Sequence, residues 1–309
     1  MEWANTQKIA EANDIYTVEP EIVAMYLTHV FMTAEADEVG HGRVAIASAA
    51  IACNFFLVGR PSPTDHPACS LVREISKRTL HASKLKRGSM QPEHIRSLVA
   101  RFAGADAPLP DLMIVVCIVI MFAGFLRFSD LAQVSVRHDL LVLAETHMSL
   151  VIPKSKTDQT GLGHTTRIAR IGGPTCPVAL TERLLTLGAY RRVPTSPAED
   201  VGPLLRRVKK TAHGHALQRT SGTTKSPIPC LRYTSFREKF RSMCSEIGID
   251  HGIMPHSMRI GGNSAAAAHG VSEEARKAHG RWKSSEMVQL YTRRKEEEAL
   301  EVTRNLGLG

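Results

Sequence analysis

The sequence PHSMRIGGNSAAAAHG at residues 255–270 decides how the rest of this chain is interpreted. Pro255 suits the first turn of a helix, and His256 and Arg259, three residues apart, then project from one face of that turn. The backbone N–H groups and the helix dipole at such a start attract an anion. This stretch therefore predicts a helix that presents a histidine and an arginine to one negatively charged group, although an isolated H-x-x-R is more often an ordinary surface pair.

A second stretch, HGRWKSSEMVQLYTRR at residues 279–294, contains a tyrosine, Tyr291, nine residues after Trp282. Far upstream, Arg127 comes directly after a fifteen-residue apolar run, and Asp130 follows three residues later. An arginine at the rigid end of a buried helix can grip phosphate oxygens with its planar guanidinium group. Taken singly, a tyrosine on a helix more often packs than reacts, and an arginine with a nearby acid is more often a helix cap with a salt bridge.

The strand pattern between these stretches predicts a small antiparallel sheet. Residues 138–143, 148–152 and 165–171 are short β-type segments, and the turn KSKT between the last two contains Lys154 and Lys156. A lysine at a hairpin tip is usually solvated, so this turn is not diagnostic by itself. It does place a long cationic side chain on a β-hairpin that follows Arg127 in the chain.

Helical periodicity accounts for most of the remaining chain, so the predicted fold is mainly α with a small antiparallel β-sheet, an α+β protein. The basic, glycine-containing segment KLKRGSMQ at residues 84–91 predicts an interdomain linker, followed by a new helix at Pro92. We therefore expect an all-α domain at residues 1–87 and a mixed α/β domain at residues 88–309. Residues 188–229, with five prolines, are predicted to be partly irregular. The expected helices cover residues 21–34, 44–58, 68–80, 112–126, 234–247, 256–269, 272–280 and 284–300.

The charge distribution predicts a polyanionic partner. The formal net charge is +9, and residues 183–241 alone contain thirteen lysines and arginines against three acidic residues. Such blocks neutralise phosphates and release counterions, which makes binding sensitive to salt. The alternative for each block is a solvated surface or a basic loop. A smaller basic cluster lies upstream and consists of Lys77, Arg78, Lys84, Lys86 and Arg87.

Composition argues against several other classes of protein. The six cysteines are scattered without a CxxC pair, so neither a disulfide framework nor a zinc site is expected, and a reducing, intracellular compartment is the default. Residues 1–13 show no secretory signal pattern. The apolar run at residues 112–126 is shorter than the roughly 20 residues of a membrane-spanning helix, so no membrane partner is expected.

Taken in chain order, these features resemble the tyrosine recombinases of the phage-integrase family. The family pattern is an arginine with an acid three residues later, a lysine on a β-hairpin, then H-x-x-R, a histidine or tryptophan further along, and a tyrosine nine residues beyond that. The helical N-terminal third is similar to the family's core-binding domain, which is a less specific likeness. The residues of this chain that fill the slots are Arg127, Lys156, His256, Arg259, Trp282 and Tyr291.

The resemblance implies a site-specific recombinase or integrase that breaks and rejoins DNA strands through a covalent 3′-phosphotyrosyl bond at Tyr291. A tyrosine hydroxyl has an ordinary pKa of about 10, so it must lose its proton in the transition state, with His256 nearby. The two arginines would hold the non-bridging phosphate oxygens, and Lys156 would protonate the departing 5′ oxygen. Trp282 would pack beneath the site and donate one hydrogen bond through its indole N–H. No nucleotide cofactor and no metal are implied.

Some assignments remain open in the sequence. Lys154 takes the acid role if the hairpin register differs by two, and His279 competes with Trp282 because the family more often has a histidine in that slot. The pair Gly261–Gly262 inside a helix costs roughly 1 kcal/mol per glycine relative to alanine, which a close approach of DNA, of another helix or simple packing would explain. The acidic tail after Tyr291 either docks on a neighbouring protomer or is a solvated helix.

The implied partners are double-stranded DNA and further copies of the chain, a homo-oligomer that is a tetramer on DNA. Residues 1–87 and 88–309 would then grip the duplex from opposite sides. In a eukaryotic host, RRVKK at residues 206–210 could serve as a nuclear signal. The rival functions are a type IB topoisomerase, which shares the Arg/Lys/Arg/Tyr chemistry, and a non-catalytic DNA-binding protein derived from a mobile-element recombinase. A metal-dependent nuclease is a poor third, since no carboxylate cluster is evident.

Overall fold

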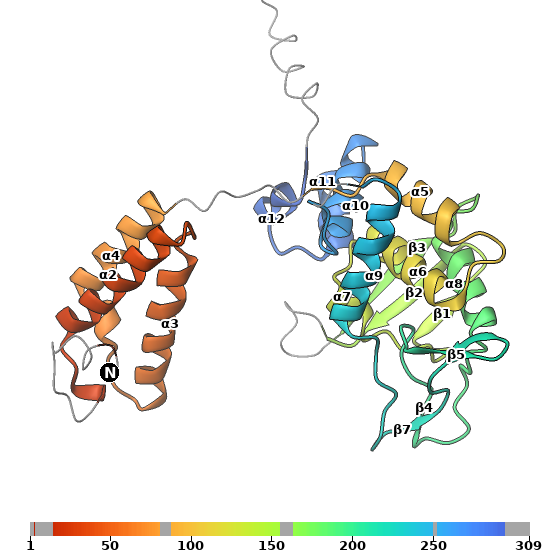
Figure 1. Ribbon diagram of the computed structural model, residues 1–309, viewed down its shortest axis with the longest axis horizontal. Helices are drawn as coiled ribbons and strands as arrows, with labels where there is room; N and C mark the ends of the chain where they lie inside the picture. Colours follow the sequence, from red (N-terminus) through yellow and green to blue (C-terminus); the bar gives the residue numbers. More distant parts are fainter. Residues whose placement is uncertain (1–2, 4–14, 81–87, 155–162, 250–251, 294–309) are drawn as a thin grey trace, which may run out of the picture. The chain divides into compact units, whose positions relative to one another are not determined.

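The computed structural model describes residue 3 and residues 15–80, 88–154, 163–249 and 252–293. The chain divides into two compact units, Met1–Lys86 and Arg87–Gly309. Figure 1 colours the chain along its sequence, so the helices of the first unit are red to orange. Helices dominate the described parts of both units, and the sheets there are small and antiparallel. The predicted α+β class, mainly α, is confirmed, whereas the separate roles assigned to residues 1–87 and 88–309 stay a prediction.

The described part of the first unit is a helical bundle with its own core. Proline begins two of its helices, because its fixed φ suits the first helical turn and its missing N–H is not needed there. Leu27, Val44 and Cys69 are fully buried between the helices. The periodicity-based helices of this region are confirmed to within two residues at each end. They are α2 Pro20–Ala36, α3 Gly42–Leu57 and α4 Pro67–Thr79, with 3-10 turns at Ile15–Thr17 and Pro63–Asp65.

A nearly all-apolar helix, α6 Leu109–Ala123, forms the centre of the second unit. It is buried along its length because other helices pack around it. The predicted buried helix is confirmed, but it ends three residues before the predicted position 126. Gly124 follows the last turn, and Phe125 adopts a left-handed φ of 49°, which a helix cannot continue through. The elements that contact α6 include α5 Pro92–Phe102, α7 Phe128–Leu131, α8 Pro177–Leu187, α9 Tyr233–Glu246 and α10 Ser257–Ala268.

The predicted antiparallel sheet is present, with strand order β1-β2-β3. Its strands are β1 Leu141–Leu143, β2 His147–Ile152 and β3 His164–Ala169. Alternate residues of β2 are buried, which is the expected pattern for a strand with one face on the core. The first predicted strand was too long at its start, because residues 138–140 form a turn closed by the Leu140 N–H and the Arg137 carbonyl. The loop between β2 and β3, residues 155–162, lies outside the described residues.

The region predicted to be partly irregular contains two short ribbons. Strand β4 Glu199–Asp200 pairs with β7 Gly222–Thr223, and β5 Val208–Thr211 pairs with β6 Gly214–Leu217. Just before it lies α8, which the periodicity argument missed. Its signals were local: Pro177 in the first turn and Gly188 directly after the last residue.

The C-terminal helices are shorter than predicted. Helix α10 is followed by α11 Glu273–Gly280 and α12 Ser285–Leu290. The last helix was expected to continue from residue 284 to 300, but among the described residues it ends at Leu290. The chain tightens there, because the Val288 carbonyl accepts from the Tyr291 N–H at 3.1 Å and not from the N–H of residue 292. The same carbonyl also accepts from the Asn263 amide at 3.3 Å and the Thr292 hydroxyl at 2.8 Å. Residues 294–309, including the acidic tail, lie outside the described residues.

The two glycines in α10 are explained by packing inside the protein. A Cβ added at Gly261 would lie 1.9 Å from the carbonyl oxygen of Met90, and one at Gly262 would lie 2.1 Å from that of Phe122. Glycine is required where two backbones approach this closely. Of the explanations considered for the pair, packing against neighbouring backbone therefore holds in this structure.

The segment just before α5 belongs to the second unit. The Gly88 N–H donates to the Gly252 carbonyl and the Met90 N–H donates to the Ser257 carbonyl, both at 3.2 Å. The remainder of the predicted linker, residues 84–87, lies outside the described residues, so the boundary after residue 87 stays a prediction. Among the described residues, no helix, α6 included, combines the length and the apolarity that a membrane span requires.

Candidate active site

The first turn of α10 places Arg259 at the centre of a buried polar site. Its side chain is only 1% exposed. One guanidinium nitrogen donates to the Phe125 carbonyl and the other to the Gly280 carbonyl, the latter at 2.6 Å. The guanidinium carbon lies 4.5 Å from the ring centroid of Trp282, so the indole face stacks on the cation. These contacts fix the guanidinium group with little freedom to move.

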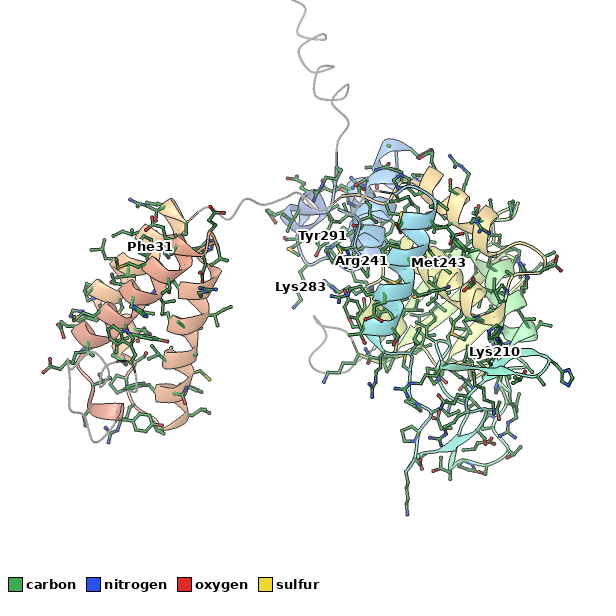
Figure 2. All side chains as sticks on the ribbon, in the orientation of Figure 1. Phe31, Lys210, Arg241, Met243, Lys283 and Tyr291 are labelled. Carbon is green, nitrogen blue, oxygen red and sulfur yellow. The ribbon has the colours of Figure 1, made fainter. Side chains whose placement is uncertain are left out.

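Tyr291 lies against this arginine. The centroid of its ring is 5.4 Å from the Arg259 guanidinium carbon, 5.4 Å from the Trp282 ring and 5.2 Å from the His256 ring. The histidine meets the tyrosine edge-on, at 60°. The structure thus brings four of the predicted site residues into one cluster. Figure 2 labels Tyr291 beside the C-terminal helices of the second unit.

Side chains from α10 and α11 hold the segment that carries Tyr291. The Asn263 amide donates to Thr292 at 3.0 Å, and Arg276 donates to both Asn263 and Thr292. The Ser264 hydroxyl accepts from the Arg293 N–H at 2.8 Å. Sequence reasoning missed these supporting residues. Helical spacing could have found Asn263, because it lies four residues after Arg259 and so on the same side of the helix.

Arg127 stands at the start of α7, where its own N–H donates to the buried carboxylate of Asp130 at 3.1 Å. This confirms that the arginine and the acid three residues later interact, through the main chain of the arginine. Arg127 lines a cavity of about 260 Å³. The cavity wall also includes Phe128, Ser129, Tyr233, Pro255 and His256.

The charges and the hydrogen-bonding groups of this cluster suit an anion. Burial, followed by the positive charges of Arg127 and Arg281, lowers the pKa of Arg259 to about 9. Arg259 Nε and Trp282 Nε1 are buried donors for which the described residues provide no acceptor. Buried donors are almost always satisfied, so a group that accepts hydrogen bonds and carries negative charge fits here. Among the described residues, no group of three or more histidines, cysteines or acids could hold a metal ion.

No protein-family model and no curated protein sequence matches this chain, but solved structures do. A Tn1549 transposon integrase in complex with transposon right end DNA gives a TM-score of 0.59, covering 99% of this chain and 91% of that chain at 12% sequence identity. The XerH site-specific recombinase bound to palindromic difH substrate gives 0.60, with 98% and 76% covered at 9% identity. A lambda integrase dimer bound to a COC′ core site gives 0.55, with 94% and 69% covered at 11% identity.

The chain has the tyrosine recombinase fold. All three comparisons extend over both compact units, so the likeness is not confined to the part that holds Tyr291.

One of the open residue assignments concerns the predicted histidine-or-tryptophan position. Trp282 contacts both Arg259 and Tyr291. His279 instead shares a hydrogen bond of 2.8 Å with the Ala123 carbonyl, and its ring meets Phe125 edge-on at 4.7 Å. The geometry therefore favours Trp282 as the residue that supports the tyrosine.

The two candidates for the predicted hairpin lysine are only partly covered by the described residues. Lys156 lies outside the described residues. Lys154 is described and exposed, and its main-chain carbonyl accepts from the Gln133 amide at 3.0 Å. The choice between these lysines as general acid stays open.

The basic segment at residues 183–241 is less available to a partner than its charge suggests, because several of its cations hold the fold together. Arg206 is 1% exposed and stacks on Tyr190, so the nuclear signal considered at residues 206–210 is not fully presented by the folded chain. The other internally engaged cations are Arg183 on the carbonyls of residues 103–105, Arg191 on Glu199, Arg192 on the Val136 and Leu141 carbonyls, and Lys239 on Asp111.

Proposed function

We propose that this chain is a site-specific DNA recombinase that cleaves and rejoins double-stranded DNA through a covalent bond between Tyr291 and a 3′ phosphate. The observation that carries the proposal is the packing of the Tyr291 ring against Arg259, His256 and Trp282. The fold adds support, because the solved structures that share it are integrases and recombinases in complex with DNA.

The reaction follows from the chemistry of these groups. The Tyr291 oxygen attacks the phosphorus, the bond from phosphorus to the 5′ oxygen breaks, and the 5′ oxygen takes a proton from Lys156 or Lys154. Arg127 and Arg259 stabilise the negative charge that grows on the non-bridging oxygens. The phosphotyrosine bond keeps the energy of the broken phosphodiester, so attack by a 5′ hydroxyl reverses the step and rejoins a strand.

His256 has a specific place in this scheme. Its ring is edge-on to the Tyr291 ring, with the two ring centroids 5.2 Å apart, and it lines the same cavity as Arg127. We assign it to proton transfer at the nucleophile. The neighbouring Trp282 packs under the site and offers a phosphate oxygen its indole N–H, which has no acceptor among the described residues.

The working assembly that we propose is a tetramer on DNA. Strand exchange between two duplexes needs a nucleophile for each of four strands, which four copies of one tyrosine supply. In each protomer, residues 1–87 and residues 88–309 would hold the duplex from opposite sides. The protein is then DNA-associated while it acts.

A covalent adduct assay tests the proposal. The protein is mixed with DNA from the flanks of its coding region, the reaction is stopped with detergent, and protein–DNA adducts are separated by denaturing electrophoresis. Wild type should form an adduct, and Tyr291→Phe should form none, because the phenyl ring keeps the packing but removes the attacking oxygen.

Tyr233→Phe is the matched control. Tyr233 is 45% exposed and lines the same cavity as Arg127 and His256, so it is the most plausible competing nucleophile among the described tyrosines. We expect its phenylalanine variant to form adduct like wild type. An adduct that persists in Tyr291→Phe would contradict the assignment, and its loss in Tyr233→Phe would identify Tyr233 as the nucleophile.

Two rival functions are separate outcomes of the same experiment. Adducts accompanied by relaxation of supercoiled DNA by a monomer, without a preferred site, would indicate a type IB topoisomerase. Salt-sensitive DNA binding with no adduct on any substrate would indicate a non-catalytic DNA-binding protein.

A further inference from the structure

One charged residue in the site has no counterpart in the sequence pattern. Arg281 lies between Gly280 and Trp282 and has a left-handed backbone, with φ 56° and ψ 42°. A non-glycine residue occupies this region at a cost in free energy and persists there when its side chain is held by surrounding contacts. The Arg281 side chain is 20% exposed, and burial lowers the pKa of its guanidinium group.

The contacts of that side chain join two separate parts of the second unit. One guanidinium nitrogen donates to Asp130 Oδ2 at 3.3 Å, and the other is hydrogen-bonded to His164 Nε2. The same Asp130 oxygen accepts from the Arg127 N–H. His164 begins β3 and pairs with Ile152 at the end of β2, so it stands at the base of the hairpin that carries the candidate lysines.

We propose that Arg281 is a positioning residue for strand cleavage, which links the main chain at Arg127, the base of the lysine hairpin and the segment leading to Tyr291. The proposal rests on the proposed function and adds to it a residue that acts through others. Asp130 is 0% exposed, and its second oxygen has no donor among the described residues. Without Arg281 this carboxylate would keep only the Arg127 N–H among the contacts described for it.

The protonation of His164 follows from this arrangement. A guanidinium group only donates hydrogen bonds, so His164 Nε2 must accept and the proton of the neutral ring must be on Nδ1. The tautomer of His164 therefore reports on the contact with Arg281 whether or not DNA is present.

The left-handed backbone of Arg281 allows a substitution that removes the side chain without straining the main chain. Arg281→Gly removes the guanidinium group at a position where glycine is conformationally favoured, so the backbone does not resist the change. The rate of adduct formation at saturating DNA should fall by about 100-fold, as expected for small displacements of reacting groups. The dissociation constant for DNA should stay at the wild-type value. Free guanidinium ion, below denaturing concentrations, should restore part of the rate.

Ala189→Gly is the matched control. Ala189 is an exposed residue of the same unit with a similar left-handed φ of 49°, so its glycine variant repeats the backbone change without removing a charged group. It should cleave like wild type and not respond to guanidinium ion. Arg281→Lys, which keeps a charge but cannot reach both partners in the fork geometry, should cleave at an intermediate rate.

The outcomes separate this proposal from the function on which it rests. If wild type forms no adduct with any DNA, the proposed function fails and the positioning role fails with it. If wild type is active and Arg281→Gly cleaves at the wild-type rate, or loses DNA affinity with an unchanged rate at saturation, only the positioning role is overturned. Nitrogen chemical shifts of His164 that match the Nε2–H tautomer in wild type would overturn it as well.

Discussion

At the scale of single residues, the site depends on close contacts that the side-chain chemistry alone does not reveal. Arg259 stacks on Trp282 and approaches Tyr291, and the helix that carries it, α10, packs closely against α6 and the segment before α5. Gly261 allows the close approach to Met90, before α5, and Gly262 allows that to Phe122 in α6, since both neighbours are main-chain carbonyl groups.

Gly261→Ala should therefore destabilise the protein. The added methyl group would lie 1.9 Å from the Met90 carbonyl oxygen, and overpacking of this kind costs roughly 1–3 kcal/mol in the free energy of unfolding. Urea denaturation would measure the change. The control is Gly252→Ala in the same unit, where a Cβ meets nothing within 4 Å. Equal stabilities of the two variants would show that the backbone approach is not as close as described.

At the scale of elements, α10 performs three tasks within one short helix. Its N-terminal turn presents His256 and Arg259, its glycines face Met90 and Phe122, and Asn263 with Ser264 holds the chain around Tyr291. Because one short helix holds both Arg259 and the chain around Tyr291, the geometry between these two side chains stays constant, which favours a preorganised site.

Removal of the Asn263 amide should reduce the rate of adduct formation by Tyr291 more than it reduces the affinity for DNA. In Asn263→Ala, the Val288 carbonyl, Thr292 and Arg276 each lose a partner. We expect the free energy of unfolding to fall by about 1–3 kcal/mol and the rate of adduct formation at saturating DNA to fall by about tenfold or more.

Asn54→Ala serves as the comparison for that experiment. Asn54 is exposed on α3, where its amide donates to the Ala50 carbonyl of its own helix. Its substitution should leave both the stability and the adduct rate near wild type. A dissociation constant for DNA that rises in Asn263→Ala while the rate at saturation is unchanged would argue against a role in placing Tyr291.

At the scale of the whole molecule, net charge overstates the number of cations that can meet DNA. Several arginines of the segment 183–241 are used inside the fold, on carbonyl groups or on acids. The cations that remain exposed lie in different places on the second unit: Figure 2 labels Lys210 on β5 and Arg241 on α9, well apart in that view.

Single substitutions of two cations on α9 test which of the two contacts a DNA phosphate. Arg241 is exposed and has no ion pair among the described residues, whereas Lys239 pairs with Asp111 at 2.9 Å. Arg241→Gln should weaken DNA binding and reduce the slope of log K against log salt by about one phosphate contact, roughly 0.9. Lys239→Gln should leave the slope unchanged. Fluorescence anisotropy across a salt series measures both, and equal slopes for the two variants would refute the distinction.

The sequence by itself determined the helical periodicity, the buried central helix, the antiparallel hairpin and the order of the candidate site residues. These are local properties, because helix and strand patterns repeat within a few residues and the reactive side chains are chemically distinctive. Even so, short helices capped by proline and glycine, such as α8, escaped the periodicity argument because they offer few repeats.

Only the tertiary structure decided which residues meet. It placed His256, Arg259, Trp282 and Tyr291 in one cluster. It also hydrogen-bonded His279 to the Ala123 carbonyl and ended α12 at Leu290, before Tyr291. It also revealed Arg281, whose partners Asp130 and His164 are more than a hundred residues away in the chain. Such contacts depend on long-range packing and on competition for buried hydrogen-bonding groups, which no local pattern encodes.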